Sequence, residues 1–268
     1  MSSLWAAASL VLLCCSGAEA FSLQPLSPSV HRSLGTSAPK TLTSRAGAFR
    51  LRASVAGSLD TDRQRAKEEL VASVLKGNKN GVEASAEVRA DVDEKLATLC
   101  SLNSVEEPAY ALLRPPYDYF DGTFNLLYTN TTGGSSGKVG PFVGDVSQTF
   151  LGIRDNDAMG FSRRGIFTND VQIGPLRISL QARCEAKSET KLNIVFEETS
   201  VKVFGFQVQA KEFEVGGKGT RGSWDLRYLD EDIRVLRTNA GNVVVLQRGE
   251  PEGGESYMDK QRRLASAP

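Results

Sequence analysis

Histidine is almost missing from this sequence, and cysteine is scarce. The 268 residues include one histidine, His31, and four cysteines. His31, Cys14 and Cys15 lie in an N-terminal region that we expect to be removed, which leaves Cys100 and Cys184. Without histidine the mature chain has no His-based triad or general base, and with two cysteines it has no ordinary zinc site. We therefore expect no metal and no cofactor. Cys100 and Cys184 are interpreted as free and buried, with a redox pair as the alternative.

The sequence also has no net charge, because 32 Lys and Arg residues balance 32 Asp and Glu residues. No strong basic field is available for nucleic acid, so we exclude it as a partner. The sequence is 40% hydrophobic and 24% charged, which is typical of a folded globular chain of one large or two small domains. No segment after the N-terminal region is long and apolar enough to span a bilayer.

Residues 1–20 have the pattern of a signal peptide: a short apolar run followed by Ala18-Glu19-Ala20. Residues 21–53 are rich in Ser and Thr and hold five basic residues but no Asp or Glu, which is typical of a transit peptide. The combination, with Phe21 after the cleavage point, resembles the two-part address of proteins sent into secondary plastids of red-algal descent. A membrane anchor and a secreted protein with a disordered arm are the alternatives. Removal of residues 1–53 leaves 27 basic and 31 acidic residues, a net charge of −4.

The remaining chain changes from a helical to a strand pattern. Apolar residues recur at helical spacing in 60–76 and 87–102, so we predict an N-terminal helical segment over 54–105. We expect Asp60 or Thr61 to cap the first helix. From Gly122 onward the period becomes two, and residues 176–187 alternate cleanly between apolar and polar. The Gly-rich polar tail, 249–268, is predicted to be disordered.

The strand pattern predicts a mainly β fold over residues 106–248. Further strands are expected at 123–129, 146–153, 158–168, 192–196, 204–210, 223–229, 233–237 and 242–248, with a bulge before Phe213 and a short turn at 239–241. Eight or nine such strands indicate an antiparallel meander closed into a barrel or half-barrel. Six residues are predicted to line its interior, either around a small ligand or as packed core: Phe124, Leu126, Tyr128, Phe196, Phe204 and Phe206.

Two local motifs resemble a phosphate-binding loop and a catalytic carboxylate cluster, but we assign neither function. The Gly-rich stretch at 131–139 has the wrong spacing for a phosphate-binding loop and lacks Ser or Thr after Lys138. The acidic cluster at 230–232 lies among several Arg residues, and we interpret it as a hairpin network. We assign no catalytic residue, with an enzyme that uses Asp or Glu on a lipid substrate as an alternative.

The segment WDLRYLDEDIRVLRTNAGNVVVLQR (224–248) closely resembles the C-terminal signature of the plastid lipid-associated proteins, also called plastid fibrillins. Upstream, GTFNLLYTN (122–130) resembles the Gly-x-Trp-x-Leu-x-Tyr-Thr segment of that family, with Phe124 in place of Trp. The resemblance covers about residues 60–248. The matching residues include Gly122, Tyr228, Leu229, Asp230, Ile233, Arg234, Arg237 and Gly241.

The resemblance implies a lipocalin-like barrel behind one or two helices, without enzymatic activity. It implies a plastid protein at plastoglobules or thylakoids that binds, escorts or coats apolar isoprenoids such as carotenoids, quinones or tocopherols. Attachment to that surface is expected to be peripheral. The alternative function is an assembly factor for a prenyl-lipid synthase or a photosystem complex. The motif residues are expected to be structural. Asp230 would accept bonds from turn N–H groups, Arg234 or Arg237, and one of these Arg residues would stack on Phe124.

Overall fold

The computed structural model describes residues 45–114, 118–131, 134–152, 164–214 and 220–249, and gives residues 45–58 as backbone only. The predicted signal peptide, most of the predicted transit peptide, residues 158–163 of one predicted strand and nearly all of the tail lie outside these ranges. The predicted cleavage sites and domain boundaries therefore stay predictions.

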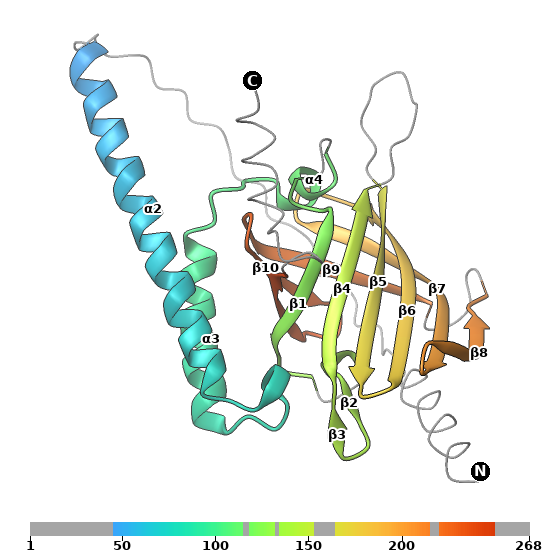
Figure 1. Ribbon diagram of the computed structural model, residues 1–268. Coiled ribbons are helices and arrows are strands. Elements are labelled where there is room, and N and C mark those ends of the chain that lie inside the picture. Colours follow the sequence, from blue (N-terminus) through green and yellow to red (C-terminus); the bar gives the residue numbers. More distant parts are fainter. Residues whose placement is uncertain (1–44, 115–117, 132–133, 153–163, 215–219, 250–268) are drawn as a thin grey trace, which may run out of the picture.

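Eight antiparallel strands form a closed ring in which chain neighbours are also sheet neighbours (Figure 1). In ring order they are β1 (Gly122–Thr129), β4 (Asp145–Gly152), β5 (Arg164–Ile173), β6 (Leu176–Ala186), β7 (Lys191–Val203), β9 (Arg221–Leu229), β10 (Ile233–Thr238) and β11 (Val243–Arg248). The ring closes because β11 pairs with β1. This mainly β, antiparallel arrangement confirms the predicted fold class.

Two smaller strand elements lie outside the ring. The hairpin of β2 (Lys138–Val139) and β3 (Phe142–Val143) follows η2 (Gly134–Ser136) in the connection from β1 to β4. Strand β8 (Phe206–Glu212) pairs with the C-terminal half of β7, beyond the part of β7 that pairs with β9. The hairpin and the β7–β8 turn lie at the same end of the barrel (Figure 1), which we call the β8 end.

A bulge in β1 turns its side chains from one face of the sheet to the other. Leu126 pairs with Leu246, the register slips at Leu127, and Tyr128 pairs with Val245. Leu126 and Leu246 belong to the cluster inside the barrel, whereas Tyr128 and Val245 belong to a second cluster outside it. Because an extra residue in one strand reverses the alternation, Tyr128 points away from the interior.

Two helices cover the outer face of the closing strands. Helix α2 (Arg45–Leu75) and helix α3 (Ala86–Ser101), joined through η1 (Lys79–Gly81), pack Leu70, Val92 and Leu99 against outward residues of β1, β9, β10 and β11 (Figure 1). Both helices overlap those predicted. The predicted cap at Asp60 or Thr61 is wrong, because α2 begins at Arg45 and those residues lie inside it. Ser85 caps α3, and its Oγ accepts from the backbone N–H of Val88 at 3.3 Å.

A short helix closes the other end of the barrel, which we call the α4 end. Helix α4 (Pro108–Leu112) is anchored where the backbone N–H of Ala109 donates to Glu189 O in the β6–β7 turn, at 2.8 Å. Leu112, Leu113 and Phe120 from this segment are fully or almost fully buried in the interior cluster. The sequence did not predict this helix, because five residues are too few to show a helical period.

A substitution at Gly165 tests how tightly the side chains at the α4 end are packed. A Cβ at Gly165 would lie 2.5 Å from Phe120 Cε1 and Cζ, both inside the core. Replacing Gly165 with Ala must therefore displace Phe120, and we expect a loss of roughly 1–3 kcal/mol in the free energy of unfolding, measured by denaturant titration. Gly222→Ala on β9 is the matched control, because its Cβ would meet nothing closer than 3.7 Å. Equal stability of the two variants would contradict a packed α4 end.

Candidate functional site

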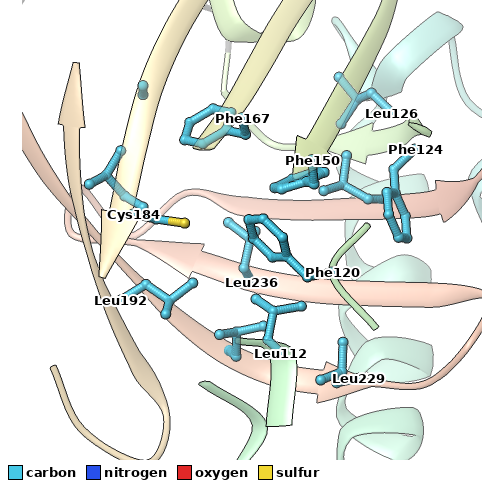
Figure 2. Packing of buried hydrophobic residues seen from close by; sticks show 14 of the residues in the cluster. Leu112, Phe120, Phe124, Leu126, Phe150, Phe167, Cys184, Leu192, Leu229 and Leu236 are labelled. Carbon is cyan, nitrogen blue, oxygen red and sulfur yellow. The ribbon is translucent and has the colours of Figure 1, made fainter. Parts of the chain in front are cut away.

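The centre of the barrel is a chain of aromatic rings in contact with one another. Phe150 lies at the middle, with ring centroids 5.0 Å from Phe120, 5.5 Å from Phe124 and 5.6 Å from Phe167. Trp224 extends the chain, 4.7 Å from Phe167. In Figure 2 the rings of Phe120, Phe124, Phe150 and Phe167 point into the space between the strands, with Leu112, Leu192 and Leu236 around them. Such edge-to-face and offset contacts are the favoured geometry for aromatic pairs.

The side chain of Arg234 is completely buried within this aromatic group. Its Cζ lies 4.2 Å from the ring centroids of both Phe124 and Phe150. One nitrogen, Nη2, donates to Tyr119 O at 2.6 Å, whereas Nε and Nη1 have no hydrogen-bond partner among the described residues. Burial, together with the nearby Arg248, lowers the pKa of Arg234 to about 9, so the cation stays the main form at neutral pH. Of the two Arg residues predicted to stack on Phe124, Arg234 is the one that does, and the ring faces offset part of the cost of its desolvation.

Arg248 holds Phe124 as well. Its Cζ lies 4.5 Å from the Phe124 centroid, and its guanidinium donates to the carbonyls of Asp121, Asp118 and Glu231 at 2.6–2.8 Å. Gly122 makes room for it, because a Cβ there would lie 2.6 Å from Arg248 Nη1. The sequence did not single out Arg248, although it ends the segment that carries the resemblance. Its role depends on the β1–β11 pairing, which places it opposite Phe124.

A row of polar side chains crosses the apolar interior. Gln148 on β4 pairs with Asn169 on β5, Asn169 with Leu180 on β6, and Leu180 with Thr199 on β7. Gln148 Nε2 donates to Asn169 Oδ1 at 3.0 Å. Within the part of the chain that the structure describes, Gln148 Oε1 and Thr199 Oγ1 are buried without a hydrogen-bond partner. Each such atom costs about 1–3 kcal/mol in a dry interior, so two of them in one row require a physical reason.

The β9–β10 turn is organised by Asp230. Its Oδ1 accepts from the backbone N–H of Asp232 at 2.9 Å and of Ile233 at 2.7 Å. Its Oδ2 accepts from Tyr228 Oη at 2.7 Å and lies 3.0 Å from Lys67 Nζ on α2. Of the alternatives predicted for Asp230, the structure shows the bonds to turn N–H groups and not a bond to Arg234 or Arg237. Arg234 points into the core and Arg237 is exposed, so the cation comes from the helix layer.

The surroundings of Asp230 shift the pKa values of Tyr228 and Lys67. Burial, followed by the hydrogen bond to Asp230, raises the pKa of Tyr228 far above its ordinary value. Burial alone lowers the pKa of Lys67, but hydrogen bonds with Asp232 and Asp230 outweigh it and raise the pKa overall. The turn therefore ties α2 to the barrel through one charged group.

The six predicted interior residues are divided by the structure. Phe124 and Leu126 are buried in the interior cluster, and Phe196 packs partly buried against it. Tyr128 is buried outside the barrel, for the reason given above. The interior placement of Phe204 and Phe206 is wrong, because both are 77% exposed. The alternation misled the prediction because β8 extends beyond the ring, where neither of its faces packs on a core.

The exposed aromatic residues gather at the β8 end. Phe204 and Phe206 flank the β7–β8 turn at Gly205, and Phe142 on the β2–β3 hairpin is 62% exposed. Leu75, 74% exposed, ends α2 at the same end of the molecule (Figure 1). The backbone N–H of Phe204 donates to Pro175 O at 2.9 Å, which fixes this turn to the β5–β6 turn. On and beside this turn, three exposed apolar side chains form what we call the β8-end patch: Phe204, Phe206 and Val208.

Cys100 and Cys184, the cysteines within the described ranges, are both free thiols. Cys184 faces the interior on β6, where burial raises its pKa to about 12, and Cys100 lies in α3 among partly buried residues. They belong to the clusters on opposite faces of the sheet. Within the described ranges, no three His, Cys, Asp or Glu side chains come together as a potential metal site. No described helix has an apolar stretch long enough to cross a bilayer.

The sequence model of the PAP_fibrillin family matches residues 64–247, which span α2 to the penultimate residue of β11. The chain belongs to this family. PAP_fibrillin members are plastid lipid-associated proteins, and this chain is therefore a plastid lipid-associated protein. Searches of curated proteins and of solved structures gave no significant match.

The PAP_fibrillin signature residues hold the barrel closed. Arg234 fills the aromatic group, Asp230 shapes the β9–β10 turn, and Gly241 has a φ of +82° in the β10–β11 turn, where its N–H donates to Thr238 O at 2.9 Å. Tyr228 reaches Asp230, and Leu229 belongs to the interior cluster. The signature thus describes how the fold is built.

Asp230 gives the most direct test of the signature. Replacing Asp230 with Ala removes two backbone hydrogen bonds and leaves Lys67 without its more buried partner, so we expect stability to fall by roughly 1.5–3 kcal/mol. Asp232→Ala is the control, since Asp232 is largely exposed and its ion pair with Lys67 should contribute less than about 1 kcal/mol. Thermal unfolding of both variants provides the measurement. An unchanged melting temperature for Asp230→Ala would show that the turn does not need the carboxylate.

Tyr228 makes stability depend on alkaline pH. Since its folded pKa is raised, its contribution is complete below the pKa of an unfolded tyrosine, about 10, and is lost as the pH rises toward the folded value. Tyr228→Phe should therefore lose less stability than the wild type between about pH 9 and 11. Denaturant unfolding across this range measures the difference. Parallel pH curves for the two proteins would mean that Tyr228 is not protonated more tightly in the folded state.

Proposed function

We propose that the protein acts without catalysis as a peripheral lipid-associated protein of the plastid. The β8-end patch attaches the barrel to the surface of a plastoglobule or thylakoid, and the interior holds an apolar isoprenoid such as a carotenoid, quinone or tocopherol. The observation that carries this proposal is the position of the patch. Its aromatic residues sit at one end of an apolar barrel, and α4 closes the opposite end.

The charges near the patch support apolar attachment. Lys79 pairs with Asp145 at 2.6 Å, and Lys138 pairs with Glu83, so these two basic groups at the β8 end are neutralised by acidic neighbours. The net charge of −4 that remains without residues 1–53 also gives no strong attraction to anionic lipid, so the free energy of attachment must come from burying aromatic surface. Rigid tips with Phe on both sides of a glycine turn suit insertion into an interface, where the rings leave water and the backbone stays bonded.

We expect the double variant Phe204→Ser, Phe206→Ser to bind lipid surfaces about tenfold more weakly, which corresponds to roughly 1.4 kcal/mol and is less than the full burial of one Phe. The measurement is flotation with vesicles of uncharged phosphatidylcholine. Raising the salt concentration should change wild-type binding little, because the interaction is apolar.

Leu151→Ser is the matched control. Leu151 is also a large exposed apolar residue, 55% exposed on β4, but it lies near the α4 end of its strand. It should float as the wild type does. Equal losses in the two variants, or no loss in the double variant, would overturn attachment by the β8 end.

A further inference from the structure

The polar row inside the barrel is the feature that the family signature and the attachment surface leave unexplained. Gln148 lies between Val146 and Phe150 on β4, and Thr199 lies opposite Leu180, whose neighbours Ile178 and Ala182 face the interior. Both side chains therefore point inward, and they are 8% and 6% exposed. The aromatic group and Arg234 lie on the α4 side of this row, and Val146, Val171 and Ile178 lie on the β8 side.

The atoms left without partners define which group would satisfy them. Gln148 Nε2 is engaged by Asn169, so the free atom of Gln148 is the carbonyl oxygen Oε1, an acceptor that needs a donor. Thr199 Oγ1 both donates and accepts. A ligand hydroxyl supplies a donor and an acceptor at once, whereas a ketone, a quinone or a hydrocarbon supplies no donor for Gln148.

We propose that the polar row is a hydroxyl-binding site for an apolar lipid that carries an alcohol or phenol group. The lipid's hydroxyl hydrogen-bonds to Gln148 Oε1 or Thr199 Oγ1 at mid-depth in the barrel, and its hydrocarbon part lies against the aliphatic side chains toward the β8 end. This deepens the proposed function, on whose interior lipid site it rests, by selecting reduced, hydroxylated lipids over their carbonyl counterparts.

The selectivity is tested with a matched pair of probes, β-ionol and β-ionone, which share one carbon skeleton and differ in a hydroxyl against a carbonyl. Isothermal titration of the full chain should show β-ionol binding at least fivefold more tightly. Thr199→Val and Gln148→Leu should each reduce this ratio, and the double variant should bind both probes equally. Thr199→Val keeps the side-chain shape and removes an unpaired hydroxyl, so its melting temperature should match or exceed that of the wild type.

Thr168→Val is the control, because Thr168 lies on β5 next to Asn169 and faces the outside of the same sheet. It should keep the wild-type ratio. Equal binding of the two probes by the wild type, or binding of neither, would overturn the proposal, as would a ratio unchanged in the double variant. If water molecules alone bind the polar row, the protein will give one of these three results.

Different results would overturn the interior hydroxyl site and the attachment through the β8 end. Flotation through Phe204 and Phe206 with no preference for β-ionol would leave attachment standing and remove the hydroxyl site. A β-ionol preference in a protein that does not float would keep the interior site and remove the β8-end surface.

Discussion

The pairing of β1 with β11 is the constraint on which the rest of the structure depends. It joins residues more than a hundred positions apart along the chain, at an entropic cost that grows with the logarithm of the loop length. Closure brings Phe124 between two guanidinium groups, one from β10 and one from the end of β11. The bond from Arg234 on β10 to Tyr119 O, just before β1, spans the same closure.

Closure also explains why the helices are needed. The ring has an apolar inner face, aromatic toward the α4 end and aliphatic toward the β8 end, and an outer face that is apolar where β1, β10 and β11 meet. Val243 to Leu246 run without alternation, as strands buried on both faces do. Helices α2 and α3 cover this outer region, and Lys67 bonded to Asp230 ties that layer to the barrel. The signature residues thus serve one physical purpose, which is to keep a closed sheet covered on both sides.

The two ends of the barrel differ in structure, and this difference determines from which end the proposed lipid enters. The α4 end is packed with Leu112, Leu113 and Phe120, whereas the β8 end carries exposed aromatic rings on rigid turns. An apolar lipid that leaves a surface at the β8 end would meet aliphatic side chains first and the polar row next. The packed aromatic group would stop it there. Attachment and selection are then separate steps, carried by different residues.

The sequence by itself determined the periodic elements and the family. Alternation from residue 176 onward, helical spacing in 60–76 and 87–102, and the turn at 239–241 were all visible, because these patterns depend on local geometry. Stacking of an Arg residue on Phe124 was also expected through the resemblance, although the choice between Arg234 and Arg237 was left open. Only the tertiary structure decided which face each residue takes. A single extra residue at Leu127 sends Tyr128 outside the barrel, and β8, placed beyond the ring, leaves Phe204 and Phe206 in water. The polar row of Gln148, Asn169 and Thr199 comes from three strands separated in sequence. Their register is set by long-range pairing, which no local pattern encodes.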